Sequence, residues 1–117
     1  MERYRVDWPT RAIREWGSTG ASMLPLVRGH DPAAVTWLRV DRGGCVGRHE
    51  TAVPQLFMVV AGQGWVRADA DQLPLTAGQA AFLQAGESHE SGSDHGMTVV
   101  VIESEGLDPD SMLERLD

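Results

Sequence analysis

Hydrophobic residues occur along this chain in short runs that glycine, proline and acidic turn residues separate. The runs are rich in β-branched and aromatic residues, which is typical of strands rather than helices. Gly62-Gln63-Gly64 joins two of them, and such a glycine-bearing turn predicts a β-hairpin. Turn signals recur about every ten residues, which favours an all-β sandwich or barrel. The expected strands cover residues 34–40, 55–61, 65–68, 72–75, 79–83 and 97–102.

A helical pattern is scarce, and its best example lies near the end of the chain. Asp108 stands where an N-cap is needed, and Pro109 would occupy the first helical position, where a missing N–H has no cost. The following apolar residues would then lie on one stripe of a short C-terminal helix. These residues are Met112, Leu113 and Leu116.

The length of 117 residues and the mass of 12.7 kDa correspond to a single domain with one sizeable core. Hydrophobic residues make up 42% of the chain and charged residues 23%, which excludes a disordered protein, a collagen and a coiled coil. We expect an N-terminal arm over residues 1–20, a barrel over 21–103 and a tail with the short helix over 104–117.

The net charge of −7, without a basic patch, argues against nucleic acid and anionic membranes as partners. Every one of the 10 basic residues is arginine, so Schiff-base and pyridoxal phosphate chemistry, which need a lysine amine, are excluded. The apolar runs, such as Met97–Ile102, are too short to span a membrane. Cys45 is the single cysteine, so an internal disulfide is excluded. No apolar stretch follows the first residues, and we expect a cytoplasmic protein without a secretory signal.

The 4 histidines are the obvious candidates for metal ligands, and their surroundings divide them. His30 and His95 lie in segments that resemble exposed turns. His49 and His89 adjoin expected strands, and on neighbouring antiparallel strands they could point into one cavity. If His49 points inward, strand parity turns Thr51 inward and Glu50 outward. A lone histidine in a β protein is more often a surface or hydrogen-bonded core residue, so spacing alone leaves these alternatives open.

Other reactive side chains have simpler explanations. Glu90, like Glu50, follows an inward histidine, and parity gives both glutamates a salt-bridged or solvated surface role. Cys45 has no basic neighbour to activate it, so we expect a small core residue. The tryptophans at 8, 16, 37 and 65 are expected in the core or at an interface, since buried aromatic residues mostly serve to bury area.

Two spacings along the chain resemble the two motifs of the cupin superfamily. In the first motif, Gly43 is followed by five residues and His49, then Thr51, Gln55 after three residues, and Gly62 after six. In the second, Gly78 is followed by five residues and Gln84-Ala85-Gly86, then His89 after two residues and Ser93 after three. The resemblance covers residues 43–93 by motif, and most of 21–103 by strand pattern. It implies an all-β, single-domain cupin jelly-roll β-barrel and a homodimer.

The resemblance also implies a metal site, with changes in its ligands. The family's set of His, His, Glu and His corresponds here to His49, Thr51, Gln55 and His89. A glutamine carbonyl can still coordinate a metal but carries no charge, so a divalent ion would bind less tightly. We therefore expect a divalent metal, zinc, nickel, iron or manganese, at His49, Gln55 and His89. Thr51, Phe57 and Ser91 are expected to line the pocket.

Two functions follow from this resemblance. The first is a metal-dependent enzyme that acts on a small organic molecule by isomerisation, cyclisation, lyase chemistry or oxygenation. The second is a non-catalytic binding or sensing protein with a metal-free pocket, in which Gln55 and His89 hydrogen-bond to each other. A general base in the cavity would favour the enzyme, and the spacing identifies none.

Overall fold

Strand β6 (Gln55–Ala68) runs through both sheets of the barrel in the computed structural model, which describes residues 1–19, 22–27 and 31–116. Its first half pairs with β8 (Gln79–Leu83) and β10 (Met97–Glu103). Its second half pairs with β7 (Asp71–Thr76) and β9 (Ser88–Ser93). Between the halves Gly62 has φ +79°, and a Cβ there would collide with the carbonyl oxygen of Gly96. Only glycine fits this position, and the strand can therefore pass from one sheet to the other.

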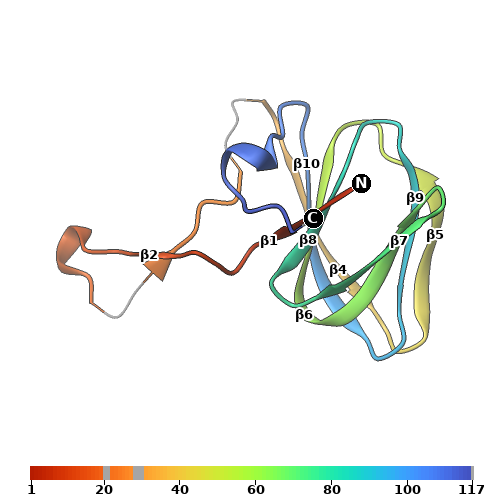
Figure 1. The fold of residues 1–117 in the computed structure, drawn as a ribbon, viewed down its shortest axis with the longest axis horizontal. Helices are drawn as coiled ribbons and strands as arrows, with labels where there is room; N and C mark the ends of the chain where they lie inside the picture. Colours follow the sequence, from red (N-terminus) through yellow and green to blue (C-terminus); the bar gives the residue numbers. More distant parts are fainter. Residues whose placement is uncertain (20–21, 28–30, 117) are drawn as a thin grey trace.

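The two sheets face each other, and β6 is common to both (Figure 1). The first sheet has the order β1 (Glu2–Arg5), β8, β6, β10 and β4 (Ala34–Val40). In the second sheet, β6 lies between β7 and β9, and β9 pairs in turn with β5 (Gly44–Glu50). All these pairings are antiparallel. The all-β barrel predicted from the strand rhythm is confirmed.

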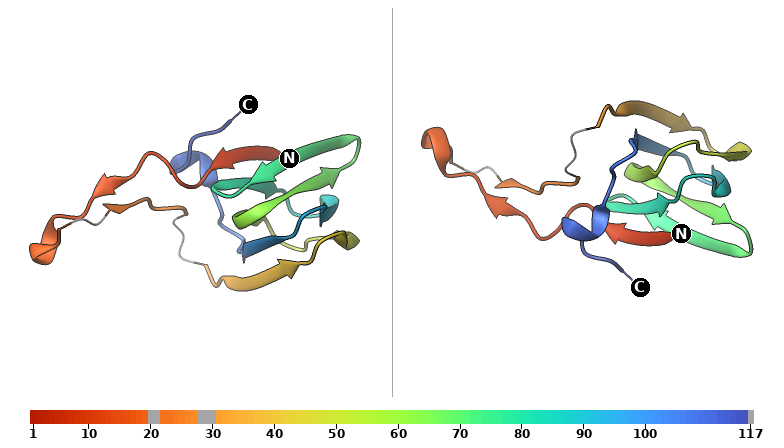
Figure 2. Two further views of the ribbon diagram at one scale, coloured as in Figure 1. Left: turned by 90° about the horizontal axis from the view of Figure 1, so that it is seen from below. Right: turned by 90° about the horizontal axis from the view of Figure 1, so that it is seen from above.

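A thin arm projects from the barrel between β1 and β4 (Figure 2). It contains β2 (Arg11–Ala12), a 3₁₀ turn η1 (Glu15–Gly17) and β3 (Ser22–Met23), and β2 and β3 pair with each other. Strand β1, at the start of the expected arm, pairs with β8 and belongs to the first sheet. The division of the chain at residues 20 and 103 stays a prediction.

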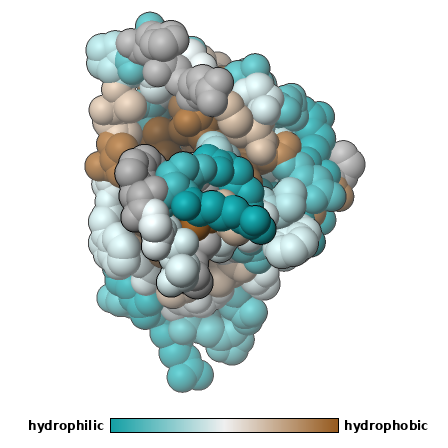
Figure 3. Space-filling model, turned by 90° about the vertical axis from the view of Figure 1, so that its left-hand side faces the viewer, coloured by the Kyte–Doolittle hydropathy of each residue, from teal (hydrophilic) through white to brown (hydrophobic). Residues whose placement is uncertain are grey.

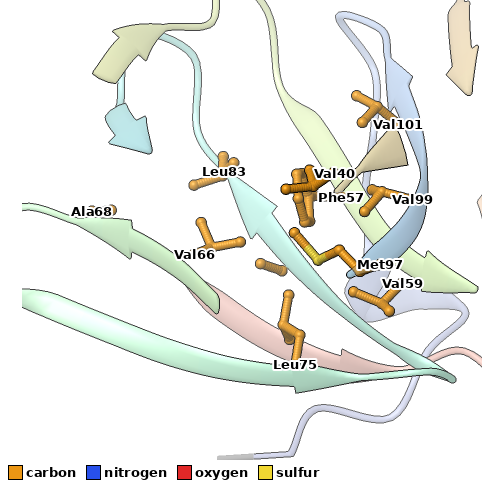
Figure 4. Close-up of a cluster of buried hydrophobic side chains, with 11 residues drawn as sticks. Val40, Phe57, Val59, Val66, Ala68, Leu75, Leu83, Met97, Val99 and Val101 are labelled. Atoms are coloured by element: carbon orange, nitrogen blue, oxygen red, sulfur yellow. The ribbon is translucent and has the colours of Figure 1, made fainter. Parts of the chain in front are cut away.

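The main hydrophobic core lies between the sheets (Figure 4). Alternate residues of β6 and β10 point into it, including Phe57, Val59, Met97 and Val99. Burying a side chain of this size stabilises the fold by roughly 1.5–3 kcal/mol. The intervening residues of β6, Leu56 and Met58, belong to a second cluster on the outer face. Because the first sheet is covered on both faces, its central strand is apolar at successive positions rather than at alternate ones.

The predicted C-terminal helix is reduced to a single 3₁₀ turn, η2 (Pro109–Ser111). Asp108 makes no side-chain cap, and after η2 the chain pairs back onto β1 through Leu116 N–H to the Arg3 carbonyl. A helix of this length is marginal without tertiary support, and the pairing with β1 competes for the same backbone groups. Leu113 nevertheless packs into the outer cluster. No helix in the described parts of the chain is long and apolar enough to cross a membrane.

Candidate functional site

A cavity of about 190 Å³ lies between the two sheets at one end of the barrel. Its apolar wall continues the core and consists of Leu38, Val46, Phe57 and Val101. Polar residues from both sheets form the rest of the wall: Thr36, His49, Gln55, His89, Ser91 and Glu103. The cavity therefore joins an apolar surface to a group of potential ligands, as small-molecule sites generally do.

His49 on β5 and His89 on β9 stand directly opposite each other in the strand register. Their ring centroids are 4.5 Å apart, with the ring planes tilted by 55°. Val46 also lines the cavity, three residues before His49, which a regular strand would not allow. The register of β5 shifts between Val46 and His49, and this irregularity turns both side chains inward. The structure thus places the two histidines, which the sequence suggested could share a cavity, along the same cavity wall.

Backbone carbonyls determine which ring nitrogen of each histidine is free. His49 Nδ1 lies 2.7 Å from the Gly47 carbonyl oxygen, and His89 Nδ1 lies 3.0 Å from that of Glu87. A carbonyl can only accept a hydrogen bond, so each Nδ1 carries the proton and donates it. Each Nε2 then has a free lone pair, which is the tautomer that metal-binding histidines commonly use.

The protonation of His89 is also suited to a ligand. The residue is 2% exposed, and burial lowers its pKa below the ordinary value of 6.5. The hydrogen bond to the Glu87 carbonyl opposes this shift, and the charge of His49 adds to it. Because the desolvation effect is the largest, the imidazole stays neutral at neutral pH and keeps its lone pair.

Gln55 and Glu103 bring an amide and a carboxylate to the same cavity. Gln55 is 6% exposed and stands opposite Glu103 in the register of β6 and β10. The described residues include no hydrogen-bond partner for the Gln55 side chain, and His89 in particular does not bond to it. Glu103 is half-buried, and its Oε2 atom lies 3.2 Å from the Thr51 hydroxyl.

These donors fit a metal ion, but as a weak site in their present arrangement. Two imidazoles with free Nε2 lone pairs and a neutral amide oxygen suit zinc, nickel or iron(II). Within the described ranges, no three His, Cys, Asp or Glu residues cluster closely enough to hold a metal ion. A metal at this place would therefore be held by His49 and His89, with Gln55 as a neutral third ligand.

The remaining predicted site residues take different places. Phe57 and Ser91 line the cavity. Thr51 is 4% exposed and is not among the residues that line the cavity; its hydroxyl donates to the Val53 carbonyl at 2.7 Å. His95 is exposed in a turn, as expected. His30 lies outside the described residues.

Glu90 lies on the surface of the second sheet, as predicted, whereas the prediction that Cys45 is a core residue was wrong. Glu90 forms ion pairs with Arg67 at 3.0 Å and Arg48 at 3.9 Å, and Glu50 is exposed. Cys45 is exposed rather than part of the core. The prediction was wrong because the irregularity in β5 places Val46, and not Cys45, on the inner face with His49.

Sequence reasoning missed Glu103 as a cavity residue. The expected strand ended at residue 102, whereas β10 continues to Glu103. Met97, Val99 and Val101 are buried on the inner face of β10, and the same alternation reaches Glu103. An acidic residue at the next inward position of the most strand-like segment was the signal that could have identified it.

The sequence matches no protein-family model and no curated protein. Solved structures do resemble the chain. A cupin superfamily protein from Desulfitobacterium hafniense has a TM-score of 0.61 at 13% identity, over 74% of this chain and 80% of that one. An RmlC-like cupin from Shewanella frigidimarina has a TM-score of 0.59 at 23% identity, over 68% of this chain and 70% of that one. A predicted oxalate decarboxylase from Thermotoga maritima has a TM-score of 0.54 at 20% identity, over 68% of both chains.

The sequence identities to these structures are below 25%, so the similarity shows the fold alone. The glycine turns and paired histidines on which the sequence resemblance was based lie within the barrel. Strand order, cavity position and structural neighbours therefore agree: the chain has the fold of the cupin superfamily.

Proposed function

We propose that the protein holds a divalent metal ion between His49 and His89 and binds or transforms a small organic molecule in the adjoining cavity. The observation that carries this proposal is the hydrogen-bonding pattern that the two rings share. Both Nδ1 atoms donate to backbone carbonyls, so both Nε2 lone pairs are free, on side chains that line one cavity. Orientation of a histidine by such a hydrogen bond is the usual support of a metal ligand.

The cavity also supports the choice of a small ligand. Its volume of about 190 Å³ is below the range of roughly 300–1,000 Å³ that drug-sized molecules occupy. Phe57, Leu38 and Val101 would contact the apolar part of the ligand and exclude water from it. A bound metal would polarise a carbonyl group or stabilise an enolate. Isomerase, cyclase, lyase and oxygenase chemistry are all compatible with this arrangement.

A non-catalytic binding protein with a metal-free pocket is the second candidate. It is favoured by one observation, namely that the described residues include no cluster of three strong metal ligands. In this case the same apolar wall would hold the ligand, and the polar residues would hydrogen-bond to it. The two candidates differ in whether the histidines bind a metal at all.

Metal titration separates them. Purified protein should be analysed for bound metal and then titrated with zinc and nickel, beside a His49→Ala/His89→Ala double variant and a His95→Ala control. His95 is an exposed histidine away from the cavity, so its loss should leave affinity unchanged. The double variant should bind at least about a hundredfold more weakly, since both imidazole ligands are gone. Equal and negligible binding by wild type and double variant would leave the metal-free pocket as the function.

A further inference from the structure

Glu103 is a carboxylate in a place where the fold otherwise buries apolar side chains. It follows Met97, Val99 and Val101 on the inner face of β10, all of which belong to the main core. Its side chain lines the cavity together with His49 and His89. Glu103 is half-buried, so its carboxylate loses part of its hydration, and a nearby cation would compensate that loss.

The described residues do not supply that partner in full. No arginine in the described ranges forms an ion pair with Glu103. Its one hydrogen-bonding neighbour is Thr51, whose hydroxyl lies 3.2 Å from Glu103 Oε2 and 2.7 Å from the Val53 carbonyl oxygen. A hydroxyl has a single proton, and the shorter contact to Val53 takes it. The carboxylate therefore faces the cavity without a cation.

The side chain beside Glu103 on the neighbouring strand is neutral, which makes a carboxylate at position 103 acceptable. In the strand register Gln55 and Glu103 are direct neighbours on β6 and β10. Two carboxylates at these positions would repel each other, whereas an amide beside a carboxylate does not. The pair therefore carries one negative charge. It lies on Glu103, whereas the family motif has its carboxylate at the position of Gln55.

Resting on the function proposed above, we propose that Glu103 supplies the carboxylate ligand of the metal that His49 and His89 hold. Glu103 would have to exchange its contact with Thr51 for the metal, because in the present arrangement no three His, Cys, Asp or Glu residues of the described chain lie close enough to hold an ion. The ligands then become two imidazoles and one carboxylate, a set that suits zinc, nickel and iron(II) far better than two imidazoles and an amide. The metal in turn provides the cation that the carboxylate lacks.

The test compares zinc and nickel affinity in wild type, Glu103→Gln and Glu50→Gln. Glu50 is exposed on the outward side of β5, next to His49, so Glu50→Gln removes the same charge outside the cavity. Glu103→Gln should weaken binding about tenfold or more, and Glu50→Gln should change it less than about threefold, because an exposed charge is screened by solvent. Circular dichroism and cooperative urea unfolding establish that each variant is folded.

A rescue variant keeps the test informative. Gln55→Glu in the Glu103→Gln background moves the carboxylate to the neighbouring strand and should bring the affinity back to within about threefold of wild type. If wild type binds metal and Glu103→Gln binds it equally well, the assignment of Glu103 is overturned and the two-histidine site stands. If wild type itself does not bind, the proposed function fails first. If Glu103→Gln weakens metal binding and the double variant does not restore it, the assignment is also overturned, because the affinity would not depend on the presence of a carboxylate in the pair.

Discussion

Two polar clusters lie on opposite faces of the first sheet, and they differ in how their charges are balanced. On the outer face, the Tyr4 hydroxyl donates to Asp110 at 2.7 Å, and Arg115 binds the same carboxylate at 2.9 Å. In the cavity that this sheet's inner face borders, His49 and His89 of the second sheet present free lone pairs, and Glu103 of the first sheet presents a carboxylate without a described cation.

The difference separates a structural cluster from a functional one. In the outer cluster each charge has a partner within the chain, and its effect is to attach the tail to β1. In the inner cluster the donors and charges converge on a cavity and require something that the described residues do not provide. His89 and Gln55 are buried there, whereas His49 is exposed and Glu103 is half-buried. Polar groups without partners that converge on a cavity are candidates for such a role. Changes to the inner cluster should therefore alter binding, and changes to the outer cluster should alter stability.

The largest effect is expected from adding a carboxylate to the inner cluster. Gln55→Glu should raise zinc and nickel affinity by about tenfold or more, where each tenfold corresponds to about 1.4 kcal/mol, because the attraction of a second carboxylate to the bound cation exceeds its repulsion with Glu103. Titration of both proteins measures this. In a metal-free pocket the new charge would instead raise the pKa of His89, visible by NMR, and leave metal binding unchanged.

The part of the outer face that the tail does not cover provides the next test. Trp37 is 70% exposed and Val35 67% exposed on the edge strand β4, and hydrophobic surface shows beside the hydrophilic arm (Figure 3). We propose that a second copy of the chain covers this surface, together with the arm, in a homodimer. Trp37→Ser should weaken self-association at least about tenfold by loss of buried aromatic area. Sedimentation that shows wild type as a monomer at micromolar concentration would contradict the dimer.

A smaller effect is expected from the balanced cluster. Tyr4→Phe removes the hydroxyl that bonds Asp110 and keeps the buried ring, so it should lower the free energy of unfolding by about 1 kcal/mol. Urea denaturation measures this loss, and metal affinity should be unchanged. A change in metal affinity would show that the two faces of the sheet are not independent.

A last effect appears only at high pH. Burial, followed by the hydrogen bond to Asp110, raises the pKa of Tyr4 from 10.0 to about 12. Between these values the unfolded chain loses the tyrosine proton while the folded chain keeps it, so the stability that Tyr4 provides is complete below pH 10 and falls as the pH rises toward 12. Tyr4→Phe should show a shallower decline of stability over this range. Parallel curves for both proteins would exclude the effect.

Some of the turns and strands could be predicted because single residues determine them. Gly43, Gly62, Gly78 and Gly86, the glycines of the two spacings, all have positive φ in the structure. The apolar runs at 34–40 and 97–102 became β4 and β10 with nearly the expected bounds. The hairpin expected at Gly62-Gln63-Gly64 was wrong, because the segments 55–61 and 65–68 are two halves of the one strand β6. The glycine turns and the strands β4 and β10 depend on local conformation and on burial of adjacent residues, and both can be recognised in a sequence.

The remaining features depend on contacts between distant segments. Strand β5 contains Gly44 and Gly47 and mostly exposed residues, so no apolar pattern marks it. Its irregularity, which placed Cys45 outside, follows from its pairing with β9. The short C-terminal helix was overridden by pairing of the tail with β1. Glu103 became a cavity residue because β10 extends one residue further beside β6.

Anomalous diffraction from crystals grown with nickel tests the central claim most directly. The account predicts one nickel ion in the cavity, bound by His49 Nε2, His89 Nε2 and the Glu103 carboxylate. A cavity without nickel, or a nickel ion bound there while Glu103 still contacts Thr51, would contradict it.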